Sequence, residues 1–162
     1  MKKVLVFLSI LMFSLTCRAQ LRAYTFDYND EFGGKQKCYL TLRSIVAEWD
    51  NSSLNVVFNC YESAVTRQKK ISPRKSFIMD LRGADFLTNV TKPIDESEIG
   101  TPRAVVLSNW AWDIALTFPF IDDFVFDDAT QQMKSVKKSL TDLHAVRVDV
   151  SLNSLAPQLA EK

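Results

Sequence analysis

The strongest alternation of apolar and polar positions in this chain lies between Trp110 and Phe118. Large apolar residues occupy every second position there, separated by small or polar ones: Trp110, Trp112, Ile114, Leu116 and Phe118 against Ala111, Asp113, Ala115 and Thr117. Alternate side chains of a β-strand point to opposite faces, so this period of two predicts a strand with one buried face. Burial of the five large side chains, at roughly 1.5 to 3 kcal/mol each, would make this strand the largest single contribution to the core.

The same alternation recurs along the chain and predicts further strands. They cover residues 21–28, 37–49, 54–61, 76–81, 103–108 and 145–152. A polar segment that contains Gly33 and Gly34 separates the first two strands and is a strong turn signal. Residues 21–49 are therefore expected to form a hairpin. Residues 84–90 fit a short helix and a strand equally well.

The hydrophobic period changes after residue 128. Apolar residues then follow one another at steps of four, three, four and three: Ala129, Met133, Val136, Leu140 and Leu143. This spacing places them on one face of an α-helix, which is therefore predicted over residues 129–143. Asp128 is placed as the N-cap residue of this helix, and Gln131 as the answering residue of a capping box.

These elements together predict a mainly β domain with one helix in its C-terminal half. Regular alternation is typical of strands in antiparallel sheets and argues against a parallel α/β fold. We therefore expect an antiparallel sandwich or a partly closed barrel, with the helix packed against it. The alternative is an α+β layout in which the helix covers one face of a single sheet.

The first 19 residues have the layout of a secretory signal peptide. Two lysines precede an apolar run over residues 4–15, and a short segment with small residues ends at Ala19, after which cleavage is predicted. Residues 20–162 would then form a single domain, exported to the periplasm or to the outside of the cell. The apolar run has about 12 residues, whereas a membrane-spanning helix needs roughly 20. The sequence therefore favours cleavage over a membrane anchor and over lipidation of Cys17, and predicts no stable membrane span after cleavage.

Cleavage changes the charge of the chain. Removal of 19 of the 162 residues leaves 143, and it takes away three of the 20 basic residues and none of the 19 acidic ones. The net charge thus changes from +1 to −2, because 17 basic residues then stand against 19 acidic ones. A slightly acidic domain lacks the basic surface that nucleic-acid binding requires, so no nucleic-acid partner is expected.

Two cysteines, Cys38 and Cys60, remain after cleavage, and in an oxidising compartment they predict a disulfide. The expected strand pairing complicates this prediction. If residues 50–53 formed a tight hairpin turn, Cys60 would lie opposite a residue near Arg43, roughly 16 Å along the strand from Cys38. A disulfide needs Cα atoms about 4.4 to 6.8 Å apart. Either the two strands are not simple hairpin partners, or the bridge does not form.

Residues with catalytic chemistry are few. His144 is the only histidine. The chain has no glycine-flanked serine of the kind that forms a nucleophile elbow. One histidine and two cysteines do not supply a tetrahedral zinc site. We assign no catalytic residue and no cofactor from the sequence.

Four aspartates form the clearest candidate for a metal site: Asp122, Asp123, Asp127 and Asp128. Calcium prefers several carboxylate oxygens, although the segment lacks the alternating acids and the central glycine of a calcium-binding loop. The alternative interpretation is that two of these acids cap the start of the predicted helix, where the helix dipole favours negative charge, and that the other two are solvated.

Five basic residues between positions 67 and 75 form a second candidate site: Arg67, Lys69, Lys70, Arg74 and Lys75. This basic loop could bind an anionic glycan, a lipid headgroup or an acidic partner protein. A solvated loop without a binding role is the alternative, because runs of charge are common on protein surfaces.

The sequence therefore favours an exported, non-enzymatic domain that binds a protein or surface partner. The basic loop and the aromatic and acidic segment 120–126 are the expected contact regions. A small β-barrel that carries an apolar ligand is one alternative, suggested by the 18 Phe, Trp and Tyr residues in the chain. A hydrolase that uses paired carboxylates, such as Glu48, Asp50 or Asp113, is a second alternative.

Overall fold

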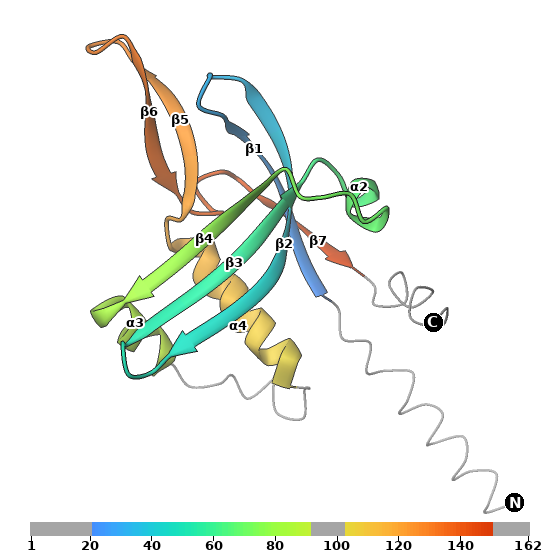
Figure 1. The fold of residues 1–162 in the computed structure, drawn as a ribbon, viewed down its shortest axis with the longest axis vertical. Helices are drawn as coiled ribbons and strands as arrows, with labels where there is room; N and C mark the ends of the chain where they lie inside the picture. The colour runs from blue at the N-terminus through green and yellow to red at the C-terminus, as the bar shows by residue number, and fades with distance from the viewer. Residues whose placement is uncertain (1–20, 92–102, 151–162) are drawn as a thin grey trace, which may run out of the picture.

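The structure is a computed structural model that describes residues 21–91 and 103–150. The predicted signal peptide, residues 1–19, lies outside the described residues. Five antiparallel strands form the main sheet in the order β4-β3-β2-β1-β7 (Figure 1). Their bounds are Leu21–Asn29 for β1, Lys35–Glu48 for β2, Ser53–Tyr61 for β3, Lys75–Arg82 for β4 and Val146–Val150 for β7.

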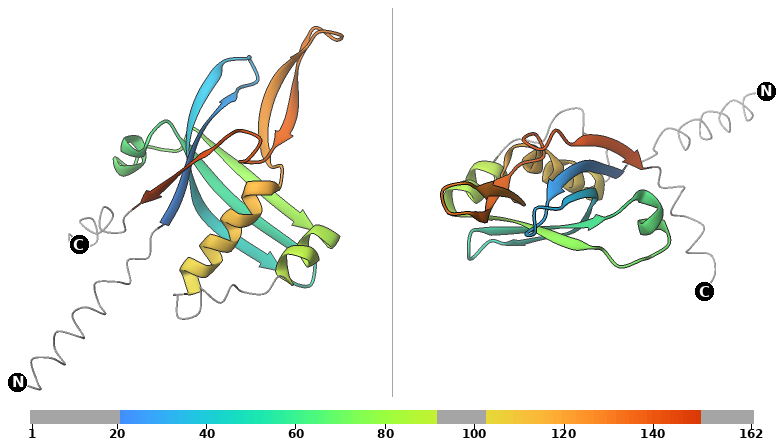
Figure 2. Two further views of the ribbon diagram at one scale, coloured as in Figure 1. Left: turned by 180° about the vertical axis from the view of Figure 1, so that it is seen from behind. Right: turned by 90° about the horizontal axis from the view of Figure 1, so that it is seen from above.

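Two further strands and three helices complete the described fold. The strands are Ile121–Asp127 (β5) and Gln132–Lys138 (β6), which form a separate antiparallel hairpin. The helices are Ala64–Gln68 (α2), Gly83–Val90 (α3) and Arg103–Thr117 (α4). Helix α4 crosses one face of the main sheet, and the β5–β6 hairpin extends beside the turn between β1 and β2 (Figures 1 and 2). The predicted mainly antiparallel β fold is confirmed, but the sheet is not closed into a barrel.

The core lies between the inner face of the main sheet and α4. Four strands contribute alternate side chains to this face, and all are buried: Tyr24, Phe26 and Tyr28 from β1, Cys38 and Leu40 from β2, Leu54, Val56, Phe58 and Cys60 from β3, and Phe77, Met79 and Leu81 from β4. Helix α4 covers them with Trp112, which is fully buried and has its ring centroid 5.0 Å from Tyr24 and 4.7 Å from Phe58. A helix thus covers one face of a single sheet, as in the α+β alternative.

The strand predicted over Trp110–Phe118 is wrong, because all of this segment except Phe118 belongs to α4. The strand predicted over residues 103–108 is wrong for the same reason. The buried positions of α4 are Ser108, Ala111, Trp112, Ile114 and Ala115, which follow helical spacing and turn one side of the helix toward the sheet. Small side chains at this contact let the helix approach the sheet closely. Alternation of the large residues concealed this pattern, because alanine carries a weak hydropathic signal.

The helix predicted over residues 129–143 is also wrong. Residues 128–131 form the turn of the β5–β6 hairpin, in which Gln131 has a positive φ of 55° and Asp127 accepts a hydrogen bond from the backbone N–H of Ala129. Strand β6 follows, and Met133 lies opposite Phe126 of β5. Pairing with β5 therefore decides the conformation of this segment against its helical spacing. The ambiguous residues 84–90 form a helix, α3.

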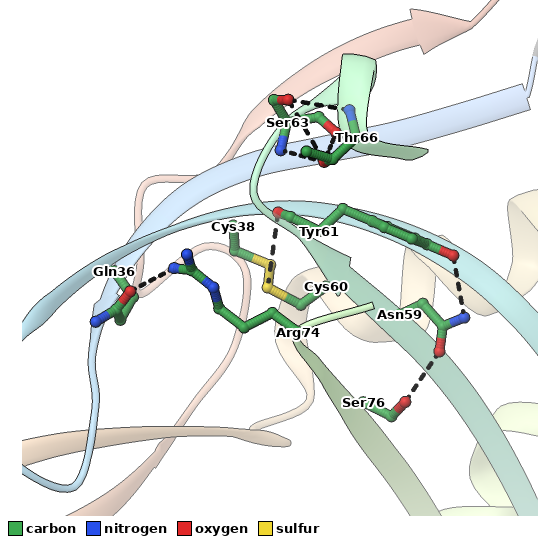
Figure 3. The surroundings of a disulfide bond; sticks show 9 residues. All are labelled: Gln36, Cys38, Asn59, Cys60, Tyr61, Ser63, Thr66, Arg74 and Ser76. Carbon is green, nitrogen blue, oxygen red and sulfur yellow. Dashed lines mark hydrogen bonds between the residues drawn. A yellow bond between two sulfur atoms is a disulfide. The ribbon is translucent and has the colours of Figure 1, made fainter. Parts of the chain in front are cut away.

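Cys38 and Cys60 are paired, with their Cα atoms 5.4 Å apart (Figure 3). Two features of the β2–β3 hairpin bring them together. The turn is displaced toward β2, so Glu48 pairs with Ser53, and a bulge between Leu42 and Ser44 shifts the register by one more residue. Cys60 consequently lies opposite Leu40 rather than near Arg43. The two strands are hairpin partners after all, and the register was the error in the prediction.

We expect the Trp112→Ala variant to lose about 3 to 5 kcal/mol of unfolding free energy, because it removes the fully buried side chain that joins α4 to the sheet. Trp49→Ala is the matched control: Trp49 is 69% exposed and contacts Phe86 edge-on, so its loss should cost about 1 kcal/mol or less. Urea unfolding followed by circular dichroism measures both. Similar losses in the two variants would contradict the packing described above.

We expect a protein that comprises residues 20–162, denatured and not reduced, to show no free thiol at Cys38 or Cys60. Replacement of both residues by serine should lower the unfolding free energy by about 3 kcal/mol, because the bridge closes a loop across a sequence separation of 22 residues. Titration with a thiol reagent and urea unfolding measure the two effects. Two reactive thiols per chain in the unreduced protein would disprove the bridge.

Candidate functional site

The five residues of the predicted basic loop separate in the structure. Arg67 lies on α2, and Lys69 and Lys70 are exposed just after that helix. Arg74 and Lys75 lie further along, where β4 begins, and both line a cleft. The loop is therefore not one continuous basic surface, and only its last two residues contribute to this cleft.

The cleft has a volume of about 550 Å³ and lies between the end of the β1–β2 hairpin, the middle of β5 and the start of β4. We call it the hairpin cleft. Its lining residues are Tyr28, Asp30, Glu31, Phe32 and Gln36 from β1, β2 and their turn, Arg74 and Lys75 at the start of β4, and Phe124 from β5. Arg74 and Lys75 come from the predicted basic loop, and Phe124 comes from the aromatic and acidic segment. The structure thus brings the two predicted contact regions together.

The ammonium group of Lys75 lies among three aromatic rings. Its Nζ atom is 5.1 Å from the ring centroid of Phe77, 5.9 Å from that of Tyr28 and 6.0 Å from that of Phe124. A cation over aromatic faces is attracted by their quadrupoles. Within the described residues no carboxylate forms an ion pair with Lys75, although Asp30 and Asp122 are near enough for its charge to contribute to the lowering of their pKa values.

Hydrogen bonds stiffen the turn that forms one wall of the cleft. The Asp30 carboxylate accepts hydrogen bonds from the backbone N–H groups of Phe32 and Gly34 and from the Gln36 side chain, at 3.0, 2.8 and 2.8 Å. The bonds from Gly34 and Gln36 outweigh desolvation and lower the pKa of Asp30. Gly33 has a φ of +78°, a conformation that a glycine adopts without strain. The predicted turn at Gly33 and Gly34 is confirmed.

Arg74 connects this turn to the neighbouring strands. Its guanidinium donates a hydrogen bond to the Gln36 side chain (Figure 3). The guanidinium also lies 3.8 Å from Glu62, and the backbone N–H of Arg74 donates to the carbonyl of Cys60 at 2.9 Å. Burial raises the pKa of Tyr28, although Arg74 opposes this effect electrostatically. Tyr28 is therefore a neutral phenol at physiological pH.

Phe32 is the most exposed large hydrophobic residue among the cleft residues that sequence reasoning missed. It is 86% exposed, the highest fraction among the large hydrophobic residues that the structure describes. A phenyl ring between Asp30–Glu31 and the two glycines of a polar turn was a visible signal, because an apolar side chain at that place has no strand or helix to pack against.

The four aspartates of the predicted metal site do not share one role. Asp123 is buried, accepts a hydrogen bond from the backbone N–H of Asn29 at 2.7 Å and pairs with Lys138 at 2.7 Å. Asp122 is bound by Ser135 and Lys137 at 2.8 and 2.9 Å. Desolvation raises the pKa of Asp122, but these two partners outweigh it and the net shift is downward.

The other two aspartates, Asp127 and Asp128, belong to the tip of the hairpin. Their predicted role as helix caps is wrong, because β6 stands in the place of that helix. Within the described residues, no three His, Cys, Asp or Glu side chains are grouped so that they could hold a metal ion.

The remaining candidate residues lie in different places. His144 is exposed in the turn before β7 and lines a small pocket of about 240 Å³ together with Asp123, Lys138 and Asp142. The backbone N–H and the hydroxyl of Ser139 both donate to Asp142 and lower the pKa of its carboxyl.

The acids considered for hydrolysis also lie apart in the fold. Glu48 ends β2, and Asp50 follows it in the β2–β3 turn. Asp113 lies on α4 and pairs with Arg22 at 2.7 Å.

Comparison of the chain with protein-family models, curated proteins and solved structures finds no match. Among the helices that the structure describes, none has the length and apolar character needed to cross a bilayer. The site must therefore be interpreted from its own geometry.

We expect Asp123→Asn to lower the unfolding free energy by about 1.5 to 3 kcal/mol, because the buried carboxylate accepts hydrogen bonds from β1 and from Lys138. Asp128→Asn is the matched control and should change it by less than about 0.5 kcal/mol, since Asp128 is exposed at the hairpin tip. Urea unfolding of the two variants measures the difference. Equal effects would show that Asp123 does not anchor the hairpin.

Proposed function

We propose that this protein is an exported, non-enzymatic domain that binds a protein or surface partner through the hairpin cleft. The observation that carries the proposal is Phe32, an 86% exposed phenyl ring on a turn stiffened by hydrogen bonds, at the rim of a cleft of about 550 Å³. Exposed aromatic side chains on well-ordered supports are typical anchors of binding surfaces, because they bury a large area with little loss of side-chain entropy.

The composition of the cleft supports a binding role in a second way. Lys75 offers a positive charge beside aromatic rings, and Arg74 and Glu31 add polar groups at the rim. A central aromatic region with a polar border is the usual anatomy of a protein–protein interface. Phe126 lies two residues after the cleft residue Phe124 on β5. It is exposed and extends the apolar surface along that strand.

Export is supported by the pattern of the first 19 residues and by the Cys38–Cys60 pair, which is compatible with an oxidising compartment. The barrel carrier lacks its structural premise, because the main sheet is open and its inner face is packed against α4.

We expect a photoreactive phenylalanine analogue at position 32 to form a covalent adduct with one partner in cells that naturally produce the protein. The same analogue at position 49 is the control, because Trp49 is also an exposed aromatic residue but lies in the turn at the opposite end of β2. Adducts are detected by electrophoresis and identified by mass spectrometry. The absence of an adduct from position 32, or the same adducts from both positions, would contradict the proposal.

A further inference from the structure

A second pocket, away from the hairpin cleft, contains three arginines. It has a volume of about 290 Å³ and lies at the middle of β2, against α2 and α4. We call it the arginine pocket. Arg22 of β1, Arg43 of β2 and Arg67 of α2 line it, together with the hydroxyl residues Thr41, Ser44 and Ser108.

Two of the three arginines carry uncompensated charge. Arg22 pairs with Asp113 at 2.7 Å, and its side chain is only 18% exposed. Within the described part of the chain, neither Arg43 nor Arg67 forms an ion pair. The pocket therefore presents two arginines, Arg43 and Arg67, that have no acidic partner among the described residues. The third, Arg22, is paired with Asp113.

Two accessible hydroxyl groups in the pocket are free to bind a ligand. Thr41 and Ser108 are 5% and 6% exposed, and the hydroxyls of both residues have no hydrogen-bond partner among the residues that the structure describes. Each hydroxyl can donate one hydrogen bond, so the two groups can bind the acceptor atoms of a ligand in this pocket.

Strand β2 is irregular beside the arginine pocket. Strand β1 pairs with Lys35–Thr41 of β2, so the described part of β2 beyond Thr41 has β3 as its neighbour on one side only. The bulge between Leu42 and Ser44 leaves Arg43 outside the regular register at this open edge. Bulges are frequent beside binding sites because they redirect a side chain, and open sheet edges can form concavities that hold anions.

We infer that the arginine pocket binds a phosphate monoester whose organic part is small and apolar. A guanidinium group binds phosphate oxygens with two parallel hydrogen bonds, and the two uncompensated arginines match the two negative charges of a monoester dianion. Thr41 and Ser108 can donate to the remaining oxygens. The apolar residues Leu42, Ile45 and Leu107 also line the pocket and provide a surface for the organic part.

The test is a titration of the ¹⁵N-labelled mature protein with phenyl phosphate at constant ionic strength, followed by amide chemical shifts. We expect saturable shifts at residues 41–45 and near Arg67. Arg43→Gln and Arg67→Gln should each weaken binding at least tenfold. Lys69→Gln, which removes the same charge two residues from Arg67 but outside the pocket, should change the affinity less than twofold. Asp113→Asn should strengthen binding severalfold, because it releases Arg22 from its carboxylate partner.

Two further arms test the chemical class of the ligand. Binding of phenyl phosphate should weaken between pH 7.5 and pH 5, because the second ionisation of a phosphate monoester has a pKa of about 6. Benzoate and inorganic phosphate should bind at least tenfold more weakly than phenyl phosphate, since one lacks a charge and the other lacks the ring. Shifts that do not saturate, an equal loss in Lys69→Gln, or benzoate binding as tight as that of phenyl phosphate would overturn the inference.

Discussion

The packing of α4 on the main sheet is the interaction on which the rest of this structure depends. Trp112 contacts Tyr24 and Phe58 from two different strands, so one side chain holds β1 and β3 under the helix. The carbonyls of Ala115 and Leu116, in the last turns of the helix, accept hydrogen bonds from the backbone N–H groups of Leu140 and Thr141. The same helix therefore positions the segment that follows β6, and with it the base of the β5–β6 hairpin.

Polar contacts then orient the hairpin against the sheet. Asp123 holds the end of β1 through the N–H of Asn29, and Lys75 lies between the rings of the sheet and that of Phe124. Both groups are largely removed from water or surrounded by rings, where electrostatic attraction is stronger than at an open surface. The hairpin cleft exists because these two contacts keep the hairpin beside the β1–β2 turn without closing onto it.

The sequence predicted the strands of the main sheet well and the segment from residue 103 to residue 143 poorly. Strands such as β3 have one face of uniformly large residues, and their alternation reports burial directly. In α4 the buried side includes Ala111 and Ala115, whose burial depends on the approach of the sheet and leaves little trace in hydropathy. Strand β6 forms because it pairs with β5. The spacing of Met133 and Val136 within the segment carries no information about that pairing. The candidate residues Arg74, Lys75 and Phe124 could be named from the sequence, but their convergence depends on these long-range contacts.

The disulfide lies close in the fold to Arg74 and Lys75, the two cations of the hairpin cleft. Cys38 lies two residues after Gln36 on β2. Cys60 lies opposite Lys75 in the β3–β4 ladder, and its backbone carbonyl accepts a hydrogen bond from the N–H of Arg74. A covalent link between β2 and β3 at this position fixes the start of β4 relative to the β1–β2 turn. The bulge after Leu42 gives the register that brings the two cysteines together, and it also places Arg43 at the arginine pocket. The bulge therefore contributes to both sites. It sets the register of β2 against β3 at the disulfide, and it places Arg43 at the arginine pocket.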